Sequence, residues 1–290
     1  MIEWYIFALV SAIFSATAAI LEKKILFKDN IIGFTTLLAI FNLILAIPFL
    51  FFIESKITSI GLLILFFKSF LGAVAFLCIM YGIKNLEVSS ALPLLVLTPG
   101  LVAFFAFIFL GEALTFYEIF GIFFLIIGIY VLQLNKNQKL LDPFKSLFKS
   151  RAYIYLILAL ILFTTTSILD KTLLKQFNMP INGFMFFQHL FFAIIFILFI
   201  ILSKKTKEIK YSLKFSWKLI LILSIVTIIY RYGELQAVKT TAVALAISIK
   251  RISVFFAVVI GGKIFREKNL FRKTIATIIM TLGAILIIFS

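Results

Sequence analysis

The chain is poor in the residues that build most catalytic and metal sites. It has one cysteine (Cys78), one histidine (His189) and 12 acidic residues among 290. A single cysteine cannot form a disulfide within the chain, and one histidine excludes a multi-histidine metal centre. The HExxH motif, the GxxxxGK[ST] loop and any plausible nucleophile–histidine arrangement are also missing. We therefore expect no catalytic residues, no metal, no cofactor and no direct use of ATP.

The 28 lysines and arginines far outnumber the 12 acidic residues, which gives the chain a net charge of +16. In a soluble protein this excess would suggest a nucleic-acid partner. Here the basic residues lie mostly in short loops between apolar runs. At such positions they contact anionic lipid headgroups and set the orientation of the chain. The expected partners are therefore membrane lipids, and no nucleic acid.

Long apolar runs are what the chain has in abundance. Hydrophobic residues make up 63% of it, against about half in soluble domains. A helix of about 20 residues is roughly 30 Å long, which matches the hydrocarbon core of a bilayer. Ten such stretches are predicted, at residues 2–21, 31–53, 60–83, 87–110, 116–134, 151–173, 181–202, 217–238, 241–262 and 270–289. The expected fold is all-α, with ten transmembrane helices in a multi-pass protein of the cell membrane.

The second half of the chain repeats features of the first in the same order. Gly33-Phe34 in the first half matches Gly183-Phe184 in the second. From the third span on, three further pairs are each 155 residues apart: Lys84 with Lys239, Glu112 with Glu267 and Gly128 with Gly283. Five is an odd number, so a duplicated five-helix unit must enter the membrane in opposite directions. We predict two inverted five-helix repeats, residues 1–134 and 151–290, joined by a basic linker at 135–150.

That linker, NKNQKLLDPFKSLFKS, has two interpretations. Its apolar residues fall at helical spacing with lysines between them, which suits a short basic helix lying on the membrane surface. A plain charged linker fits the same residues equally well.

Each repeat ends with an acid followed by a glycine-bearing apolar span. The two segments are FLGEALTFYEIFGIFFLIIGIYVL at 109–132 and IFREKNLFRKTIATIIMTLGAILI at 264–287. With the ten spans and two repeats, they resemble the EamA-like branch of the drug/metabolite transporter superfamily over nearly the whole chain. The second repeat departs from the pattern at Arg266, where the first has Gly111, and at SIKRIS (248–253), where the first has PLLVLT (93–98). The resemblance implies transport of small metabolites by alternating access.

Two adjacent basic residues near the middle of the ninth span are the sharpest site candidates. Lys250 and Arg251 lie in ALAISIKRISVFFAVVI, where a charge costs at least about 2.5–3.5 kcal/mol. Adjacent helical residues point about 100° apart. We expect one of them to face a central cavity and the other a neighbouring helix. Snorkelling to the membrane surface is the alternative.

Arg231 and Glu234 lie near the end of the eighth span, three residues apart and so on one helix face. Counted from the turn at 239–240, they lie at a depth comparable to that of Lys250. We therefore predict a Glu234–Lys250 pair, which would offset the desolvation of both charges. A purely structural ion network is the alternative to a role in substrate binding or coupling.

Two acid–base dyads occupy equivalent positions at the ends of the first and sixth spans, Glu22-Lys23 and Asp170-Lys171. The functional interpretation makes Glu22 and Asp170 gating or proton-coupling residues. The alternative places both dyads in the interface, with the lysines reaching lipid headgroups.

Proline and isolated polar residues mark further positions inside the spans. Pro93, Pro99 and Gly100 interrupt the fourth span, and a broken helix can bind substrate through its free carbonyls. A structural kink is the alternative, with Pro99 the candidate for binding. The polar candidates in the second and seventh spans are Asn42, Gln188 and His189.

Three further charged residues are given structural interpretations. Lys68 is expected to snorkel near the start of the third span. Glu112 and Glu267 precede the fifth and tenth spans, where each carboxylate would favour the helix N-terminus that follows it.

Together these features predict a secondary transporter or exchanger of a small polar metabolite, such as an amino acid or an organic anion. One alternative is an integral-membrane enzyme acting on lipid-linked substrates, which would need acidic or histidine clusters at a membrane face. The other is a non-transporting structural or sensor protein with a sealed, fully paired core. A homodimer is compatible with the sequence.

The loops also predict an orientation. Twenty lysines and arginines are expected on the side opposite the N-terminus, and five on the same side. The positive-inside rule then puts both termini outside the cytoplasm. Members of the family that the chain resembles usually have both termini inside. We follow the charge count, because the asymmetry is fourfold.

Overall fold

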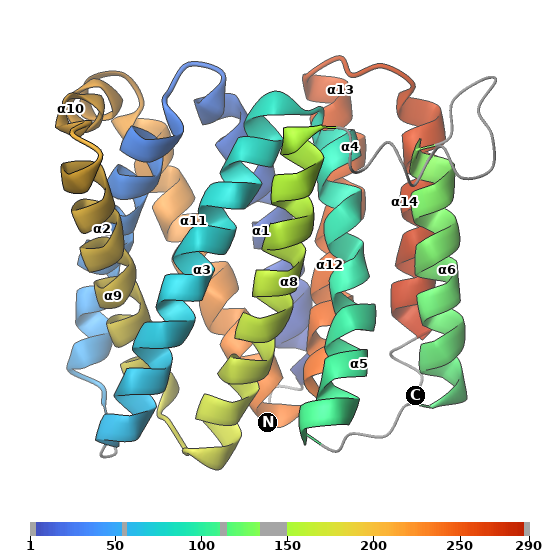
Figure 1. The fold of residues 1–290 in the computed structure, drawn as a ribbon, viewed down its shortest axis with the longest axis horizontal. Helices are drawn as coiled ribbons and strands as arrows, with labels where there is room; N and C mark the ends of the chain where they lie inside the picture. Colours follow the sequence, from blue (N-terminus) through green and yellow to red (C-terminus); the bar gives the residue numbers. More distant parts are fainter. Residues whose placement is uncertain (1–3, 54–56, 111–114, 134–149, 287–290) are drawn as a thin grey trace.

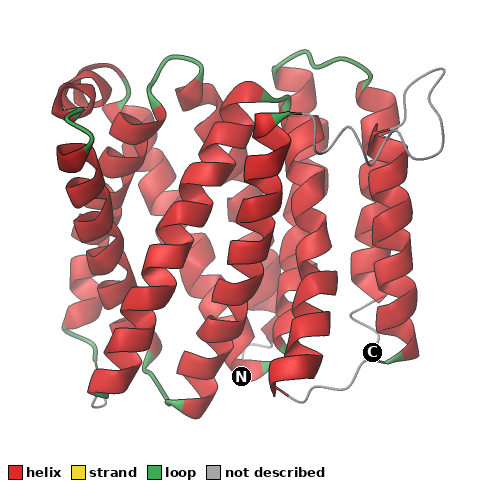
Figure 2. Ribbon diagram, viewed as in Figure 1, coloured by secondary structure: helices red, strands yellow, loops and turns green. Residues whose placement is uncertain are grey.

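The structure is a computed structural model that describes residues 4–53, 57–110, 115–133 and 150–286. Within these residues all regular secondary structure is helical (Figure 2). The long helices stand side by side across the bundle, and short connections join them at its two ends (Figure 1). The arrangement follows from the sequence, because a helix that is apolar on most sides must be buried in protein or lipid.

The described residues contain seven helical elements in the first half and nine in the second. The first are α1 (Trp4–Leu26), α2 (Ile31–Leu50), α3 (Ser59–Asn85), α4 (Val88–Ala91), η1 (Leu92–Leu97), α5 (Thr98–Leu110) and α6 (Phe116–Gln133). The second are α8 (Arg151–Lys171), η2 (Thr172–Gln176), α9 (Ile181–Leu202), α10 (Thr206–Phe215), α11 (Trp217–Thr240), α12 (Val243–Phe256), η3 (Ala257–Gly261), α13 (Gly262–Ile264) and α14 (Leu270–Leu286).

Seven helical segments in the described residues are long and apolar enough to cross a membrane. They are Trp4–Leu26, Ile31–Leu50, Ser59–Asn85, Arg151–Gln176, Ile181–Leu202, Trp217–Thr240 and Leu245–Ile264. The fourth, fifth and tenth predicted spans coincide with shorter helices, so the number ten stays a prediction. The predicted linker helix at 135–150 lies almost entirely outside the described residues.

Local sequence accounts for several helix boundaries. Asn30 caps α2 by accepting a hydrogen bond from the amide of Ile32 at 3.0 Å, and Thr58 caps α3 through the amide of Gly61 at 3.1 Å. These are the side-chain acceptors that helix N-termini prefer. At its other end α2 finishes at Leu50, two residues after Pro48. The predicted span to residue 53 is therefore too long, as a proline near a helix end would suggest.

The fourth span is interrupted, as its prolines predict. A single turn of α-helix (α4) passes into the 3₁₀ segment η1, which contains Pro93, before α5 resumes the α-helix. The ninth span is also irregular, because α12 passes into the π-helical segment η3. The sequence analysis did not foresee this second change.

The packing partners of the helices exchange between the two halves. α1 packs against α11 as its counterpart α8 packs against α3, and α1 contacts α12 as α8 contacts α5. The matching pairs α2–α9 and α6–α14 pack directly on each other. α1 and α8 run in opposite directions through the bundle (Figure 1). Sequence-equivalent helices therefore meet equivalent neighbours from opposite ends.

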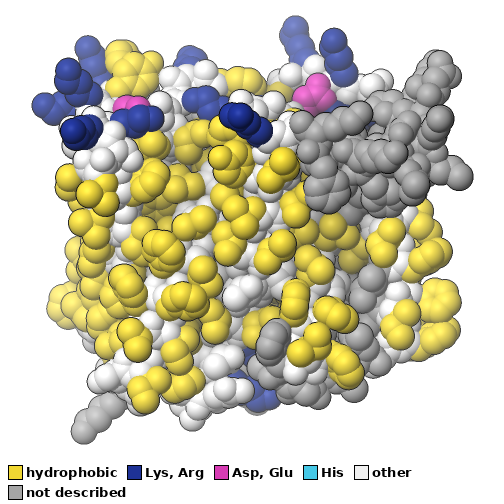
Figure 3. Space-filling model, in the orientation of Figure 1, with side chains coloured by type: hydrophobic (Ala, Val, Ile, Leu, Met, Phe, Trp, Pro, Cys, Tyr) yellow, Lys and Arg dark blue, Asp and Glu magenta, His cyan; other side chains and the backbone are white. Residues whose placement is uncertain are grey.

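The two ends of the bundle differ in charge. Most lysine and arginine side chains visible in Figure 3 lie at the end that carries α10 and α13. We call this the basic end, and the opposite end, where α1 begins and α14 finishes, the terminal end. The basic end also holds α10, which the sequence analysis had described only as a basic loop. α10 packs on the start of α2, where the Ser212 hydroxyl donates to Asp29 Oδ1 at 2.7 Å.

Candidate functional site

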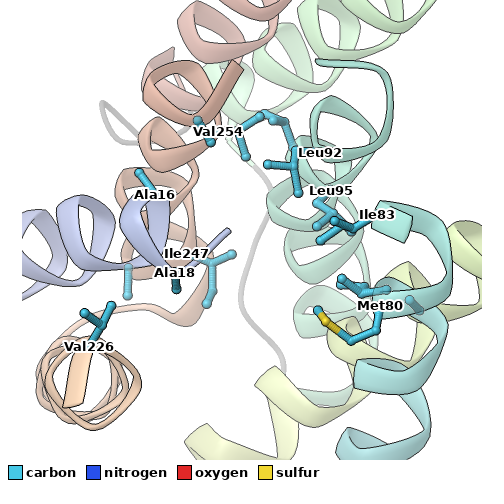
Figure 4. Close-up of a cluster of buried hydrophobic side chains, with 14 of the residues drawn as sticks. Ala16, Ala18, Met80, Ile83, Leu92, Leu95, Val226, Ile247 and Val254 are labelled. Atoms are coloured by element: carbon cyan, nitrogen blue, oxygen red, sulfur yellow. The ribbon is translucent and has the colours of Figure 1, made fainter. Parts of the chain in front are cut away.

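A cavity of about 200 Å³ lies between the two halves of the bundle. It is lined by α1, α2, α3 and η1 from the first half and by α8, α9, α11, α12 and the first residue of η3 from the second. Part of its wall is apolar. Met80, Ile83, Leu92 and Leu95 lie on one side of the space in Figure 4, and Ala16, Ala18, Ile247 and Val254 on the other.

Charged side chains form a connected chain along another part of the wall. Asp170 of α8 lies 2.9 Å from Lys68 Nζ of α3 and 2.6 Å from Arg231 Nη2 of α11. Arg231 Nη1 contacts Glu234 at 2.8 Å, and Glu234 contacts Lys250 Nζ of α12 at 2.7 Å. Positive and negative groups therefore alternate across four helices. All five side chains are buried or nearly so, which is tolerable in a membrane only because each has a counter-charge.

Gln188 of α9 ties this ion chain together. Its Oε1 accepts hydrogen bonds from Lys68 Nζ at 2.9 Å and from Arg231 Nη2 at 2.9 Å. The ring of Phe184, one helical turn away, lies 5.1 Å from Lys68 Nζ and 5.6 Å from Arg231 Cζ. Both cations are thus stabilised by an amide oxygen and an aromatic face as well as by Asp170.

The predicted contacts among Arg231, Glu234 and Lys250 are present. The Glu234–Lys250 pair joins neighbouring antiparallel helices, as their equal depth below one turn implied. The interpretation of Lys68 was wrong, because this side chain is 3% exposed and pairs with Asp170. Lys68 follows nine residues after the start of α3, about 14 Å along the helix. That depth is the signal that the sequence analysis underweighted.

Arg251 also lines the cavity but stands apart from the ion chain. Its Nη2 donates to Thr98 Oγ1 of α5 at 2.9 Å, and its buried Nε has no hydrogen-bond partner among the described residues. Within that part of the chain no carboxylate pairs with it. Lys250 lines the same cavity, so the expectation that only one of the two adjacent residues would face it was wrong.

Glu22 and Asp170, the acids of the two dyads, both line the cavity. Asp170 belongs to the ion chain. Glu22 is 8% exposed and forms no hydrogen bond or ion pair with any described residue. The two equivalent acids therefore have very different surroundings.

The lysines of the dyads turn away from the cavity and do not reach lipid headgroups. Lys23 Nζ donates to the carbonyls of Ile83 at 2.6 Å and Leu86 at 2.7 Å, at the end of α3. Lys171 Nζ donates to the carbonyls of Val238 at 2.9 Å and of Thr241, at the end of α11. These two pairs of carbonyls are again 155 residues apart. Both lysines satisfy the free carbonyls of a helix C-terminus, so the headgroup interpretation was wrong.

The remaining polar candidates divide by environment. Asn42 lines the cavity and accepts a hydrogen bond from Ser224 at 2.6 Å. His189 lines it too, is 3% exposed, and its Nε2 has no partner among the described residues. The side chain of Pro99 lies outside the described residues, as does Glu112.

Glu267 stabilises a helix N-terminus, but not that of its own span. Its carboxylate accepts from the amides of Val88 at 2.6 Å and Ser89 at 2.8 Å, and so caps α4. Beside it, Glu87 accepts hydrogen bonds from Lys273 Nζ and the amide of Lys268. Partial burial works to raise the pKa of Glu87, but these two bonds outweigh it and lower the pKa. The acids between α3 and α4 and before α14 thus join two spans at the basic end.

Comparison with known proteins identifies the family of this chain and a solved structure with the same fold. The model of the EamA-like transporter family matches residues 2–134 and again 150–289. The chain belongs to the EamA-like transporter family. A solved crystal structure of another protein shares the fold of this EamA-like chain at 15% sequence identity, with a TM-score of 0.67, covering 98% of this chain and 95% of the other. None of the curated proteins compared matches it.

Proposed function

We propose that this EamA-like protein is a secondary transporter of a small metabolite that carries an anionic group. It would lie in the cell membrane with ten spans, built as two inverted five-helix repeats (1–134 and 151–290) joined by the linker 135–150. The family match to each half and the exchange of packing partners support this architecture. Such repeats build transporters whose site lies at the repeat interface and whose halves rock to alternate access.

The arrangement of charge in the cavity supports an anionic ligand. The three cations Lys68, Arg231 and Lys250 share the two carboxylates of Asp170 and Glu234, so this group carries one excess positive charge. Among the described residues, the Nε of Arg251 has no hydrogen-bond partner, and its Nη2 donates to the neutral hydroxyl of Thr98. A guanidinium presents paired donors that match a carboxylate or phosphate. The incomplete coordination of Arg251 is the observation that carries the proposal.

The size of the cavity limits the ligand. About 200 Å³ is smaller than the roughly 300–1,000 Å³ of pockets that hold drug-sized molecules. A metabolite of amino-acid or small organic-acid size fits the proposal best. Asn42, Gln188 and His189 would supply neutral hydrogen-bonding groups, with Lys250 and Glu234 close to the bound molecule.

The two alternatives find less support in the described residues. A lipid-linked enzyme would need acidic or histidine clusters at a membrane face, whereas Asp170, Glu234 and His189 line the interior cavity. A sealed structural protein would have neither the cavity nor an Arg251 that lacks a counter-charge in the part of the chain that the structure describes.

The proposal predicts how Arg251 variants behave. A thermal-shift screen of purified protein against small carboxylates and phosphates should reveal stabilising ligands, whose exchange is then measured by counterflow in liposomes. Arg251→Ala should lose ligand stabilisation and at least about tenfold in apparent affinity, since a charge-assisted contact contributes about 1.5–3 kcal/mol. Arg251→Lys should recover only part of it, because an ammonium lacks the paired donors.

Lys263→Ala, a charge removed outside the cavity, is the matched control and should behave as the unaltered protein. Counterflow that is unchanged by Arg251→Ala would show that the arginine is structural, and would reject this site.

A further inference from the structure

Glu22 and Asp170 mark opposite ends of the cavity. Each precedes a lysine that caps a helix C-terminus: Lys23 caps α3 at the basic end, and Lys171 caps α11 at the terminal end. The two acids are therefore related by the same exchange that relates α1 to α8. Any difference between their surroundings is a difference between the two ends of the pathway.

The partners of Asp170 have no charged equivalents around Glu22. Arg231 of α11 corresponds to Phe76 of α3 at the offset of 155, and Glu234 corresponds to Ile79. Gln188 corresponds to Leu38 at the offset of 150 set by Gly33 and Gly183. Leu38, Phe76 and Ile79 all line the cavity. Glu22 is thus an acid like Asp170, while the positions equivalent to Arg231, Glu234 and Gln188 are apolar.

Among the described residues, no cation on the helices packed against α1 pairs with Glu22. On α12, Lys250 is paired with Glu234 and Arg251 contacts Thr98. On α11, Arg231 is held between Asp170 and Glu234, which leaves Tyr230 as the other ionisable group on that helix near Glu22.

The other helices that contact α1 supply no counter-charge to Glu22 in the described residues. Lys84 of α3 donates to the carbonyl of Asp29, and Lys68 is paired with Asp170. Neither α2 nor η3 contains a charged residue. In the described residues, Glu22 therefore faces the cavity without a counter-charge.

This asymmetry matters when the halves exchange conformation. The ion chain around Asp170 joins α3, α8, α11 and α12 in the half of the bundle nearer the terminal end. When inverted repeats exchange conformations, the basic end closes. Helices would then pack around Glu22 in the way that the ion chain holds helices together around Asp170 in this structure. An ionised Glu22 would then be buried among apolar side chains without compensation, which is strongly unfavourable. A neutral carboxyl group avoids that cost.

We propose that Glu22 is the coupling-proton site of the transporter. Its carboxylate takes a proton from water in the cavity while the basic end is open, closure of that end requires the protonated form, and the proton returns to water when the carboxyl ionises again. The inference rests on the proposed alternating-access function and adds the coupling ion and the residue that carries it.

The test measures access to the cavity and needs no substrate. Cys78→Ala removes the only native thiol, and Ser15→Cys introduces one on the cavity wall with little change of volume. A membrane-impermeant thiol reagent is applied from the basic end between pH 5 and pH 8. Each rate is divided by that of Lys204→Cys, an exposed thiol at the same end, to remove the pH dependence of the thiol itself.

With Glu22 present, the normalised rate should fall at least about tenfold as the pH is lowered, because an uncompensated charge shifts a two-state equilibrium by more than that. Glu22→Gln should give the low rate at every pH, and Glu22→Asp should keep a pH response. Glu208→Gln, an acid at the basic end outside the cavity, is the matched control and should keep the full response.

A normal pH response in Glu22→Gln, or a flat profile in the unaltered protein, would overturn the proton site. Loss of folding is not a substitute explanation, because Glu22→Asp must restore the response. Transport is measured separately by counterflow. If the protein exchanges metabolites but the pH dependence of the labelling rate is unchanged by Glu22 substitutions, the coupling site is rejected and the proposed transport function still holds.

Discussion

At the scale of single residues, one part of the cavity wall is built from buried charged side chains that pair with one another. Asp170 accepts contacts from Lys68, Arg231 lies between Asp170 and Glu234, and each group lies where an isolated charge would be unstable. Removing one member should therefore do more harm than removing a neutral pair. Glu22 and Arg251 are exceptions, because neither has a counter-charge among the described residues, and the two proposals place the proton and the ligand at these groups.

The ion chain predicts a specific pattern of stability. Asp170→Asn leaves Lys68 and Arg231 without their shared counter-charge and should destabilise the protein by about 3–5 kcal/mol. The readout is the thermal unfolding midpoint of purified protein in detergent. Adding Lys68→Met, which removes one of the stranded cations, should recover part of the loss. If the two substitutions simply added, the Lys68–Asp170 contact would carry no coupling energy.

At the scale of elements, one glycine fixes how α10 lies on the bundle. A Cβ on Gly33 would lie 2.6 Å from the backbone carbonyl oxygen of Glu208. Its counterpart Gly183 faces the tip of the Ile57 side chain, with a Cβ at 2.5 Å from Cδ1. The same sequence motif therefore serves two purposes. At Gly33 a backbone approaches closely, whereas at Gly183 a flexible side chain can move aside.

This difference predicts unequal effects of the same substitution. Gly33→Ala should displace α10 and cost about 1–3 kcal/mol, the usual cost of overpacking, while Gly183→Ala should cost clearly less. Thermal midpoints of the two variants give the comparison. Faster proteolysis between residues 203 and 216 in Gly33→Ala would locate the change at α10. Equal midpoints for the two variants would show that α10 shifts without cost.

At the scale of the whole molecule, charge separates the two ends more clearly than shape does. Lysines and arginines gather at the basic end with α10 and α13 (Figure 3). The first and last described helices meet the other end. The grouping of loops expected from the sequence therefore matches the bundle, while its placement relative to the cytoplasm stays a prediction.

That placement is tested by labelling from each side of the membrane. In a Cys78→Ala background, Lys204→Cys should react with an impermeant thiol reagent in inside-out vesicles and stay unlabelled in intact cells, because the positive-inside rule puts the basic end in the cytoplasm. A cysteine at Lys175, near the terminal end, should show the opposite pattern. Labelling of Lys204→Cys from outside intact cells would reverse the orientation.

The sequence by itself determined the helical, membrane-spanning character of the chain and its two-part organisation. Apolar runs of bilayer length leave little choice of backbone structure, since unpaired backbone groups in lipid are too costly. The depth of Glu234 and Lys250 below a shared turn was enough to predict their contact. Pro93 marked the break in the fourth span, because proline cannot continue the hydrogen bonds of an α-helix.

Only the tertiary structure decided which charges meet. Lys68 and Asp170 are 102 positions apart, and no local pattern indicates that α3 and α8 bring them together. Likewise, Lys23 and Lys171 point toward the carbonyls of other helices, and Glu267 caps α4 instead of α14. Each of these contacts depends on where a distant helix lies. A sequence records the depth of a charge in its own span, but the partner that neutralises it is fixed by the packing of the whole bundle.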